Sequence, residues 1–114
     1  MPAFRLLIVD DESKMLRALE RALEGWSASD EVQWEILTAE SASDALAKME
    51  HISCQAVLSD IRIGEDDGVE LLKQIREHWP QTEVILMTAF ATVENAVEAM
   101  KAGARDYLLK PFKM

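Results

Sequence analysis

Polar side chains stand directly after four short apolar segments of the chain. They are Asp10 and Asp11 after residues 4–9, Asp60 after 56–59, Thr88 after 84–87, and Lys110 after 106–109. If these segments are parallel strands of one sheet, their carboxyl ends meet at one edge, where open α/β sheets bind ligands. Each residue alone would also fit a turn or a helix cap. Together they predict a single site.

The three carboxylates of this set need a cation. Two unit charges about 4 Å apart repel by roughly 4 kcal/mol at an effective dielectric constant near 20. Oxygen ligands suit Mg²⁺, with Mn²⁺ as an alternative, and no His or Cys cluster suggests zinc or iron. A metal ion there would neutralise a phosphoryl group and orient it towards a carboxylate nucleophile. Lys110 would supply a second positive charge, and the Thr88 hydroxyl would bind a phosphoryl oxygen.

Five segments are predicted as strands, and their positions are residues 4–9, 32–37, 56–59, 84–87 and 106–109. The second alternates polar and apolar residues, which is typical of a half-exposed edge strand. The other four are apolar almost throughout, as strands buried on both faces are. Helical patterns alternate with the strands, so the fold class is α/β, with a doubly wound parallel sheet between layers of helices.

Four amphipathic helices are predicted to pack on this sheet through apolar stripes. The stripes are Met15, Leu16, Leu19 and Leu23; Ala42, Ala45, Leu46 and Met49; Val69, Leu72, Ile75 and Trp79; and Val93, Ala96, Val97 and Met100. The predicted N-caps of the first, second and fourth helices are Ser13, Ser41 and Thr92. The predicted ends of the first, third and fourth helices are Gly25, Pro80 and Gly103.

Composition restricts the class of protein further. The chain has 114 residues, 49% of them hydrophobic, which suits a single globular domain over residues 1–114. The net charge of −9 argues against direct binding of nucleic acid, because phosphate backbones need a cationic surface. No apolar run is long enough for a membrane span or signal peptide, and Cys54 is the only cysteine. We therefore expect a cytoplasmic protein without membrane contact.

From Phe4 to Phe112, the sequence resembles a response-regulator receiver domain, the phosphorylated half of two-component signalling. The resemblance implies that Asp60 is the phosphoacceptor and that a sensor histidine kinase is the partner. It implies a metal site of Asp11, Asp60 and the backbone carbonyl of Arg62, with Asp10 acting through a water molecule. It also implies that Thr88, Tyr107 and Lys110 form the switch and that Lys110–Pro111 is a cis peptide bond.

The switch would act by a shift between two conformations. Thr88 moving towards the phosphoryl group would leave space for Tyr107 to turn inward and remodel the surface around the fourth helix. Apart from the resemblance, the ordinary interpretation of Tyr107 is an edge-strand aromatic with its hydroxyl in water. Arg62 and Phe90 would flank the phosphoryl group, and the Phe90 ring would slow hydrolysis or serve only in packing.

Residues 87–112 resemble receivers of nitrogen-regulator (NtrC-like) type. In that subfamily the receiver usually precedes an AAA+ ATPase and a DNA-binding domain, so the implied role is regulation of transcription. The loop after Asp60 departs from the family pattern, because Gly64 stands where proline is usual. A glycine there predicts a freer loop backbone.

The family fold is flavodoxin-like, with strand order 2-1-3-4-5. Right-handed crossovers then place the first helix on one face and the next three on the other. The sequence has no fifth helix after the Lys110-Pro111-Phe112 motif, so the domain is expected to be truncated there. The apolar face beside the first helix would then favour self-association, as a homodimer or as a strand- or helix-exchanged assembly.

Two other functions remain open. The first is an unphosphorylated pseudo-receiver that only binds partner proteins, although such domains usually lack an acidic residue, Thr88 or Lys110. The second is a Mg²⁺-dependent phosphatase with an aspartyl nucleophile. These enzymes typically have a D-x-D motif, whereas Ile61 and Arg62 follow Asp60. We therefore expect no enzyme beyond a domain that catalyses its own phosphorylation and dephosphorylation.

Overall fold

A parallel five-stranded sheet forms the centre of the computed structural model, which describes residues 4–27, 34–89 and 92–109. The strand order is β2-β1-β3-β6-β7, which confirms the predicted order for the five main strands. The bounds are β1 Phe4–Val9, β2 Trp34–Ala39, β3 Ala56–Asp60, β6 Glu83–Thr88 and β7 Asp106–Leu109. The edge position of β2 agrees with its alternating sequence.

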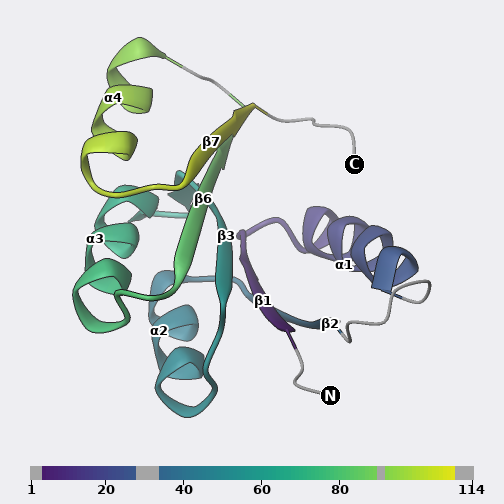
Figure 1. Cartoon of the computed structure of the whole chain (residues 1–114). Helices are drawn as coiled ribbons and strands as arrows, with labels where there is room; N and C mark the ends of the chain where they lie inside the picture. Colours follow the sequence, from purple (N-terminus) through teal and green to yellow (C-terminus); the bar gives the residue numbers. More distant parts are fainter. Residues whose placement is uncertain (1–3, 28–33, 90–91, 110–114) are drawn as a thin grey trace.

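Helices cover the two faces unequally (Figure 1). α1 lies alone on one face, and α2, α3 and α4 lie on the other, as the right-handed crossovers predicted. The bounds are α1 Ser13–Ser27, α2 Ala42–His51, α3 Gly68–His78 and α4 Val93–Lys101. Ser41 and Thr92 cap α2 and α4 as predicted, each accepting a hydrogen bond from a backbone N–H three residues later.

Each face of the sheet has its own hydrophobic core. Under α2, α3 and α4, the larger core includes Leu7, Val57, Leu72 and Leu86. Under α1, the smaller core includes Ile8, Leu16, Leu58 and Met87. Successive residues of β1 point alternately into the two cores, which explains why its sequence is apolar throughout. Within the described residues, no helix combines the length and apolar character needed to span a lipid bilayer.

Three elements differ from the sequence prediction. α1 continues through Gly25 to Ser27, because a glycine weakens a helix without ending it. β2 lies two residues later than predicted, in register with β1 from Phe4 opposite Trp34. A short antiparallel hairpin, β4 (Arg62–Ile63) with β5 (Asp66–Asp67), follows β3 and was not predicted. Strands of two residues are too short to show a periodic pattern.

The predicted stripe of α4 was wrong. Val93, Val97 and Met100 are 81%, 47% and 51% exposed, whereas Ala99 is fully buried. The helix therefore packs on the sheet through a small residue and presents its larger apolar side chains outward. Amphipathic spacing defines a stripe but does not say which neighbour covers it. In α4 the side of the helix that carries Ala99 faces the sheet.

Substitutions in α3 and α4 should separate these two stripes. Leu72→Ala should lower the free energy of unfolding by about 2–5 kcal/mol, because Leu72 is fully buried. Val97→Ala should change it by no more than about 0.5 kcal/mol, since Val97 lies at the surface. Urea denaturation measures both values. Equal losses would contradict the orientation of α4.

Candidate metal centre

Three carboxylates meet at the carboxyl edge of the sheet. Asp10 follows β1, Asp11 follows Asp10, and Asp60 ends β3, and each offers an oxygen within 4.8 Å of the others. Asp10 is fully buried, Asp60 is half-buried and Asp11 is exposed. The cluster is therefore closed on its inner side by the sheet and open to solvent through Asp11. The structure brings together the residues that the sequence placed at strand ends.

The register of the central strands explains this proximity. β1 and β3 are parallel neighbours, with Val9 opposite Ser59, so the residues that follow both positions leave the sheet side by side. The Asp10 N–H donates to the Ala39 carbonyl of β2 at 3.0 Å, which extends the ladder one residue past β1. The Asp10 carboxylate also accepts a hydrogen bond from the Glu12 N–H at 3.0 Å. These bonds fix the buried carboxylate at the start of α1.

Hydrogen bonds from residues close in the sequence hold Asp60. The Ser59 hydroxyl donates to the Asp60 carbonyl at 2.9 Å, and the Arg62 N–H donates to the Asp60 carboxylate at 3.2 Å. The next residue continues the sheet, since the Ile61 N–H donates to the Met87 carbonyl of β6 at 2.8 Å. The Asp60 carboxylate therefore has a fixed direction at the edge. The Arg62 side chain itself is exposed.

Gly68 is a site residue to which the sequence analysis gave no role. A Cβ atom at this position would lie 2.3 Å from the Asp60 carbonyl oxygen, closer than any real contact. The Gly68 N–H donates to the Ile61 carbonyl at 2.7 Å, so α3 begins directly against the end of β3. Only glycine permits this approach. The Asp67-Gly68 pair just before a helical stripe was the available signal.

Thr88 and Tyr107 lie on the strands beyond Asp60. Thr88 ends β6, the neighbour of β3, and is only 5% exposed. Tyr107 in β7 is half-buried, and its hydroxyl oxygen is buried without a hydrogen bond of normal geometry to the described residues. Burial raises the pKa of Tyr107, and the nearby backbone of Thr92 partly offsets this. The interpretation that this hydroxyl points into water was therefore wrong.

Three further predictions concern residues outside the described ranges. They are the phosphoryl contact of Lys110, the cis peptide bond Lys110–Pro111 and the position of Phe90.

The donor set fits a hard divalent cation. All three clustered side chains offer carboxylate oxygens, and Mg²⁺ is usually held by one or two carboxylates together with water. Mn²⁺ accepts the same ligands. Exposure of Asp11 leaves access for water and for a further group on the solvent side. The cluster can therefore hold a metal ion with open coordination positions next to the Asp60 carboxylate.

Comparison with known proteins identifies relatives over nearly the whole chain. The family model of the response regulator receiver domain matches residues 6–114. The chain is 45% identical over 112 residues to the regulatory protein AtoC of Escherichia coli, covering 96% of this chain and 23% of that protein. It is 42% identical over 106 residues to the transcriptional regulatory protein ZraR of Salmonella typhimurium, with 93% and 23% covered. The chain thus spans about a quarter of these relatives.

Solved structures of receiver domains share the fold. A CheY-like receiver domain protein from Methanospirillum hungatei is 33% identical with a TM-score of 0.84, covering 98% of this chain and 85% of that chain. The beryllofluoride-activated NtrC4 receiver domain dimer is 31% identical with a TM-score of 0.85, covering 96% and 85%.

Neutralising Asp11 should have opposite effects without and with Mg²⁺. In EDTA, Asp11→Asn should raise the free energy of unfolding by up to about 1 kcal/mol, because one exposed carboxylate no longer repels its neighbours. Added Mg²⁺ should stabilise the wild type by preferential binding to the folded state and should stabilise Asp11→Asn much less. Thermal unfolding with and without Mg²⁺ measures both effects. Glu12→Gln is the matched control, and an equal loss of the Mg²⁺ effect there would contradict the assignment.

Proposed function

The chain belongs to the response regulator receiver family, and on this premise we propose that it is a phosphoacceptor switch of two-component signalling. Asp60 accepts a phosphoryl group from a sensor histidine kinase in a Mg²⁺-dependent step. The observation that carries the proposal is the cluster of Asp10, Asp11 and Asp60 with oxygens within 4.8 Å, beside the buried Thr88. We take residues 1–114 as one receiver domain.

The proposed reaction is a transfer between two side chains. A carboxylate oxygen of Asp60 attacks phosphorus, the O–P bond forms as the N–P bond to the partner's histidine breaks, and the released imidazole takes up a proton. Asp11, Asp60 and the Arg62 carbonyl are the proposed ligands of Mg²⁺, with Asp10 acting through a water molecule, and the ion would neutralise phosphoryl charge when bound. The Thr88 hydroxyl donates to a phosphoryl oxygen, and Lys110 supplies a positive charge.

The proposed switch follows from the new charge at Asp60. The phosphoryl oxygens attract Thr88 and Lys110, and the conformational equilibrium shifts through Tyr107 towards the active state. Two observations support this arrangement. Thr88 ends the strand next to Asp60, and the buried Tyr107 hydroxyl has no hydrogen bond of normal geometry to the described residues that a turn of the side chain would break.

The proposed partners extend beyond this chain. AtoC and ZraR are named as regulatory proteins, and the chain matches about a quarter of each. We propose that the receiver controls an AAA+ ATPase and a DNA-binding domain in the cytoplasm, and so regulates transcription. The net charge of −9 supports placing the DNA contacts on another segment.

Phosphorylation by a small-molecule donor tests the proposal directly. Incubation with acetyl phosphate and Mg²⁺ should add one phosphoryl group to the wild type, detected by intact mass, and none in EDTA. Asp60→Asn should abolish the product, because the nucleophilic oxygen is removed. Asp44→Asn, a carboxylate on α2 outside the cluster, should react like the wild type. A folded wild type that remains unmodified would favour the pseudo-receiver instead.

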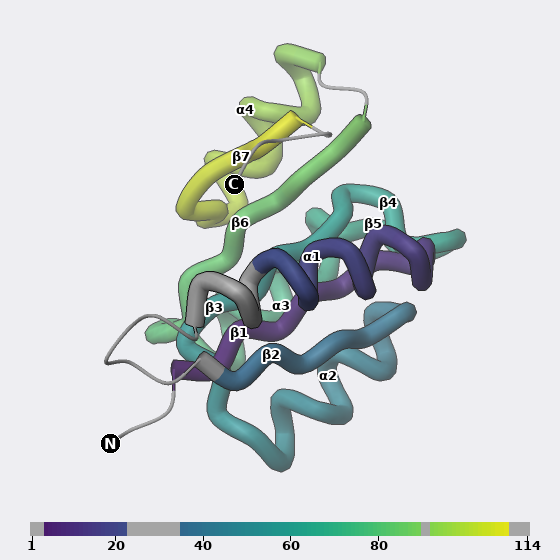
Figure 2. The backbone as a smooth tube through the Cα atoms, turned by 90° about the vertical axis from the view of Figure 1, so that its right-hand side faces the viewer, coloured from purple at the N-terminus to yellow at the C-terminus, as the bar shows by residue number. Residues whose placement is uncertain are grey.

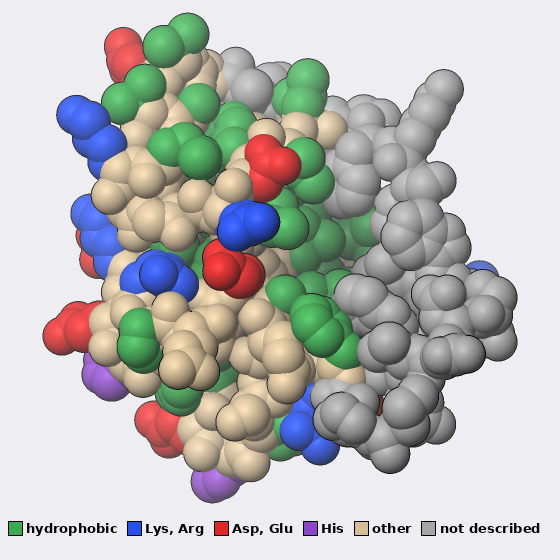
Figure 3. Space-filling view, in the orientation of Figure 1, with side chains coloured by type: hydrophobic (Ala, Val, Ile, Leu, Met, Phe, Trp, Pro, Cys, Tyr) green, Lys and Arg blue, Asp and Glu red, His purple; other side chains and the backbone are tan. Residues whose placement is uncertain are grey.

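We also propose that the activated domain forms a homodimer through α4. Val93, Val97 and Met100 form an exposed apolar stripe, and Leu109 of β7 is 54% exposed. Figure 3 shows hydrophobic side chains at the surface in the upper left, where α4 lies. Glu94 stands in the first turn of α4 and Lys101 in its last turn, so two antiparallel copies would place these opposite charges together. The NtrC4 receiver relative is described as a dimer.

Charge substitutions on two faces should locate this dimer interface. With Mg²⁺ and beryllofluoride, the wild type should show a concentration-dependent dimer in analytical ultracentrifugation. Val97→Glu should remain monomeric, because it places a charge inside the apolar contact. Ala18→Glu, an exposed position on α1, should dimerise normally. Loss of the dimer only in Ala18→Glu would instead support an interface on the α1 face.

A further inference from the structure

We propose that Asp66 is a positioning residue that ties the loop after Asp60 to the start of α2, and thereby couples α2 to the metal centre. The inference rests on the proposed function of that centre. Glycine at position 64, where proline is usual, predicts a loop backbone with fewer conformational restrictions. In the structure Gly64 has a φ of +60° and sits at the turn of the β4–β5 hairpin. The loop is therefore built differently from a proline-stiffened one.

The central contact joins residues far apart in the sequence. The Asp66 carboxylate accepts a hydrogen bond from the Ala42 N–H at 3.0 Å, across 24 residues. Ala42 is the first residue of α2, and its N–H is one of the donors that a helix cannot satisfy internally. The helix's own cap, Ser41, binds the Asp44 N–H instead. Asp66 thus completes the cap of α2 from another element and places negative charge at the positive end of its dipole.

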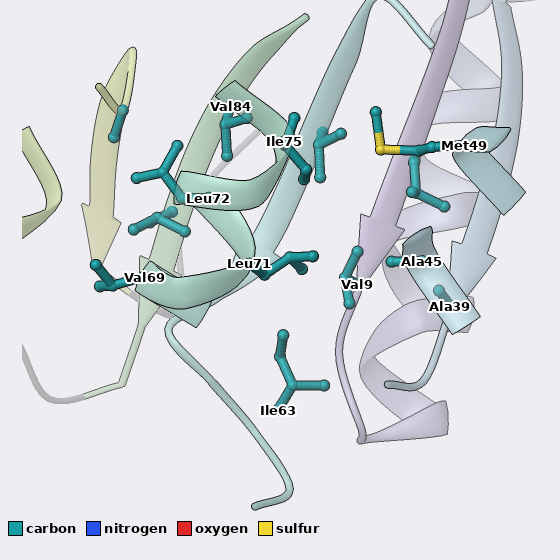
Figure 4. Packing of buried hydrophobic residues seen from close by; sticks show 14 of the residues in the cluster. Val9, Ala39, Ala45, Met49, Ile63, Val69, Leu71, Leu72, Ile75 and Val84 are labelled. Atoms are coloured by element: carbon teal, nitrogen blue, oxygen red, sulfur yellow. The ribbon is translucent and has the colours of Figure 1, made fainter. Parts of the chain in front are cut away.

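Two further contacts hold the same hairpin. Ile63 is only 1% exposed and belongs to the larger core, where its side chain points towards Leu71 and Val9 (Figure 4). Asp67 caps α3 by accepting a hydrogen bond from the Val69 N–H at 2.8 Å. Gly64 and Glu65 at the turn are exposed. β4 is therefore held by the core and β5 by two helix N-termini.

These contacts bear on the metal centre through Arg62. Its N–H donates to the Asp60 carboxylate, its carbonyl is the proposed backbone ligand, and it pairs with Asp67 across the hairpin. The hairpin and the starts of α1 and α2 lie at the same end of the sheet (Figure 2). A hairpin anchored at Asp66 keeps Arg62 in place, and a metal bound at Asp60 reciprocally strengthens the tie to Ala42.

Two variants of Asp66 separate positioning from charge. Asp66→Ala removes the acceptor, whereas Asp66→Asn retains an acceptor oxygen and loses only the charge. Ser41→Ala is the matched control, because it weakens the start of α2 without touching the hairpin. Amide NMR spectra in a titration with Mg²⁺ alone give the dissociation constant and the response of the Ala42 amide.

We expect Asp66→Ala to weaken Mg²⁺ binding by about five- to tenfold and to remove the Mg²⁺-dependent shift of Ala42. Asp66→Asn should retain most of both, and Ser41→Ala should bind Mg²⁺ like the wild type. Equal weakening in Asp66→Asn and Asp66→Ala would assign the effect to charge and overturn the proposal. Equal weakening in Ser41→Ala would assign it to the stability of α2, with the same consequence.

A metal-free measurement keeps the inference separate from the proposed function. Without Mg²⁺, ¹⁵N relaxation and amide exchange should show faster motion of residues 62–66 and faster exchange of Ala42 in Asp66→Ala. In Ser41→Ala, the motion and the amide exchange of residues 62–66 should both stay as in the wild type. Unchanged motion in Asp66→Ala would overturn the tie, whatever the metal does. A wild type that shows the tie but neither binds Mg²⁺ nor accepts phosphate would instead count against the proposed function.

Discussion

The buried carboxylate of Asp10 imposes the main constraint on this fold. It is fully buried at the end of β1, with Asp11 and Asp60 within 4.8 Å. A buried charge is unfavourable without compensation, and neighbouring charges of the same sign increase the penalty. The three carboxylates nevertheless lie together, because the parallel register places the ends of β1 and β3 side by side. Burial of apolar side chains in the two cores stabilises that register. A divalent cation held by these oxygens would reduce the repulsion among the three carboxylates.

The segment after Asp60, residues 61–67, connects the starts of α2 and α3 to the carboxyl edge of the sheet. Two consecutive aspartates each accept a hydrogen bond at a helix N-terminus. Asp66 binds the first N–H of α2, and Asp67 caps α3. Gly68 lets α3 begin in contact with the Asp60 carbonyl, and Ile63 fills the core beneath. The rigidity that a proline would give at position 64 is thus replaced by contacts with neighbouring elements. The segment that follows Asp60 thus contacts the starts of both helices.

The part of the sheet near its β7 edge is organised differently. α4 packs through Ala99 and exposes its larger apolar residues, and the neighbouring strand β7 carries Tyr107 with a buried hydroxyl. Small residues give the helix a shallow contact with the core, so less apolar burial opposes its movement. α4 is therefore held by fewer buried apolar side chains than α3.

The sequence by itself determined the parallel α/β sheet and the meeting of Asp10, Asp11 and Asp60, because apolar strands followed by polar residues place those residues at one edge. It also determined the caps at Ser41 and Thr92, which depend on local hydrogen bonds. Only the tertiary structure decided the outward face of α4, the β4–β5 hairpin and the bond between Asp66 and Ala42. These depend on contacts between distant segments, and no local periodicity records which neighbour a side chain will meet.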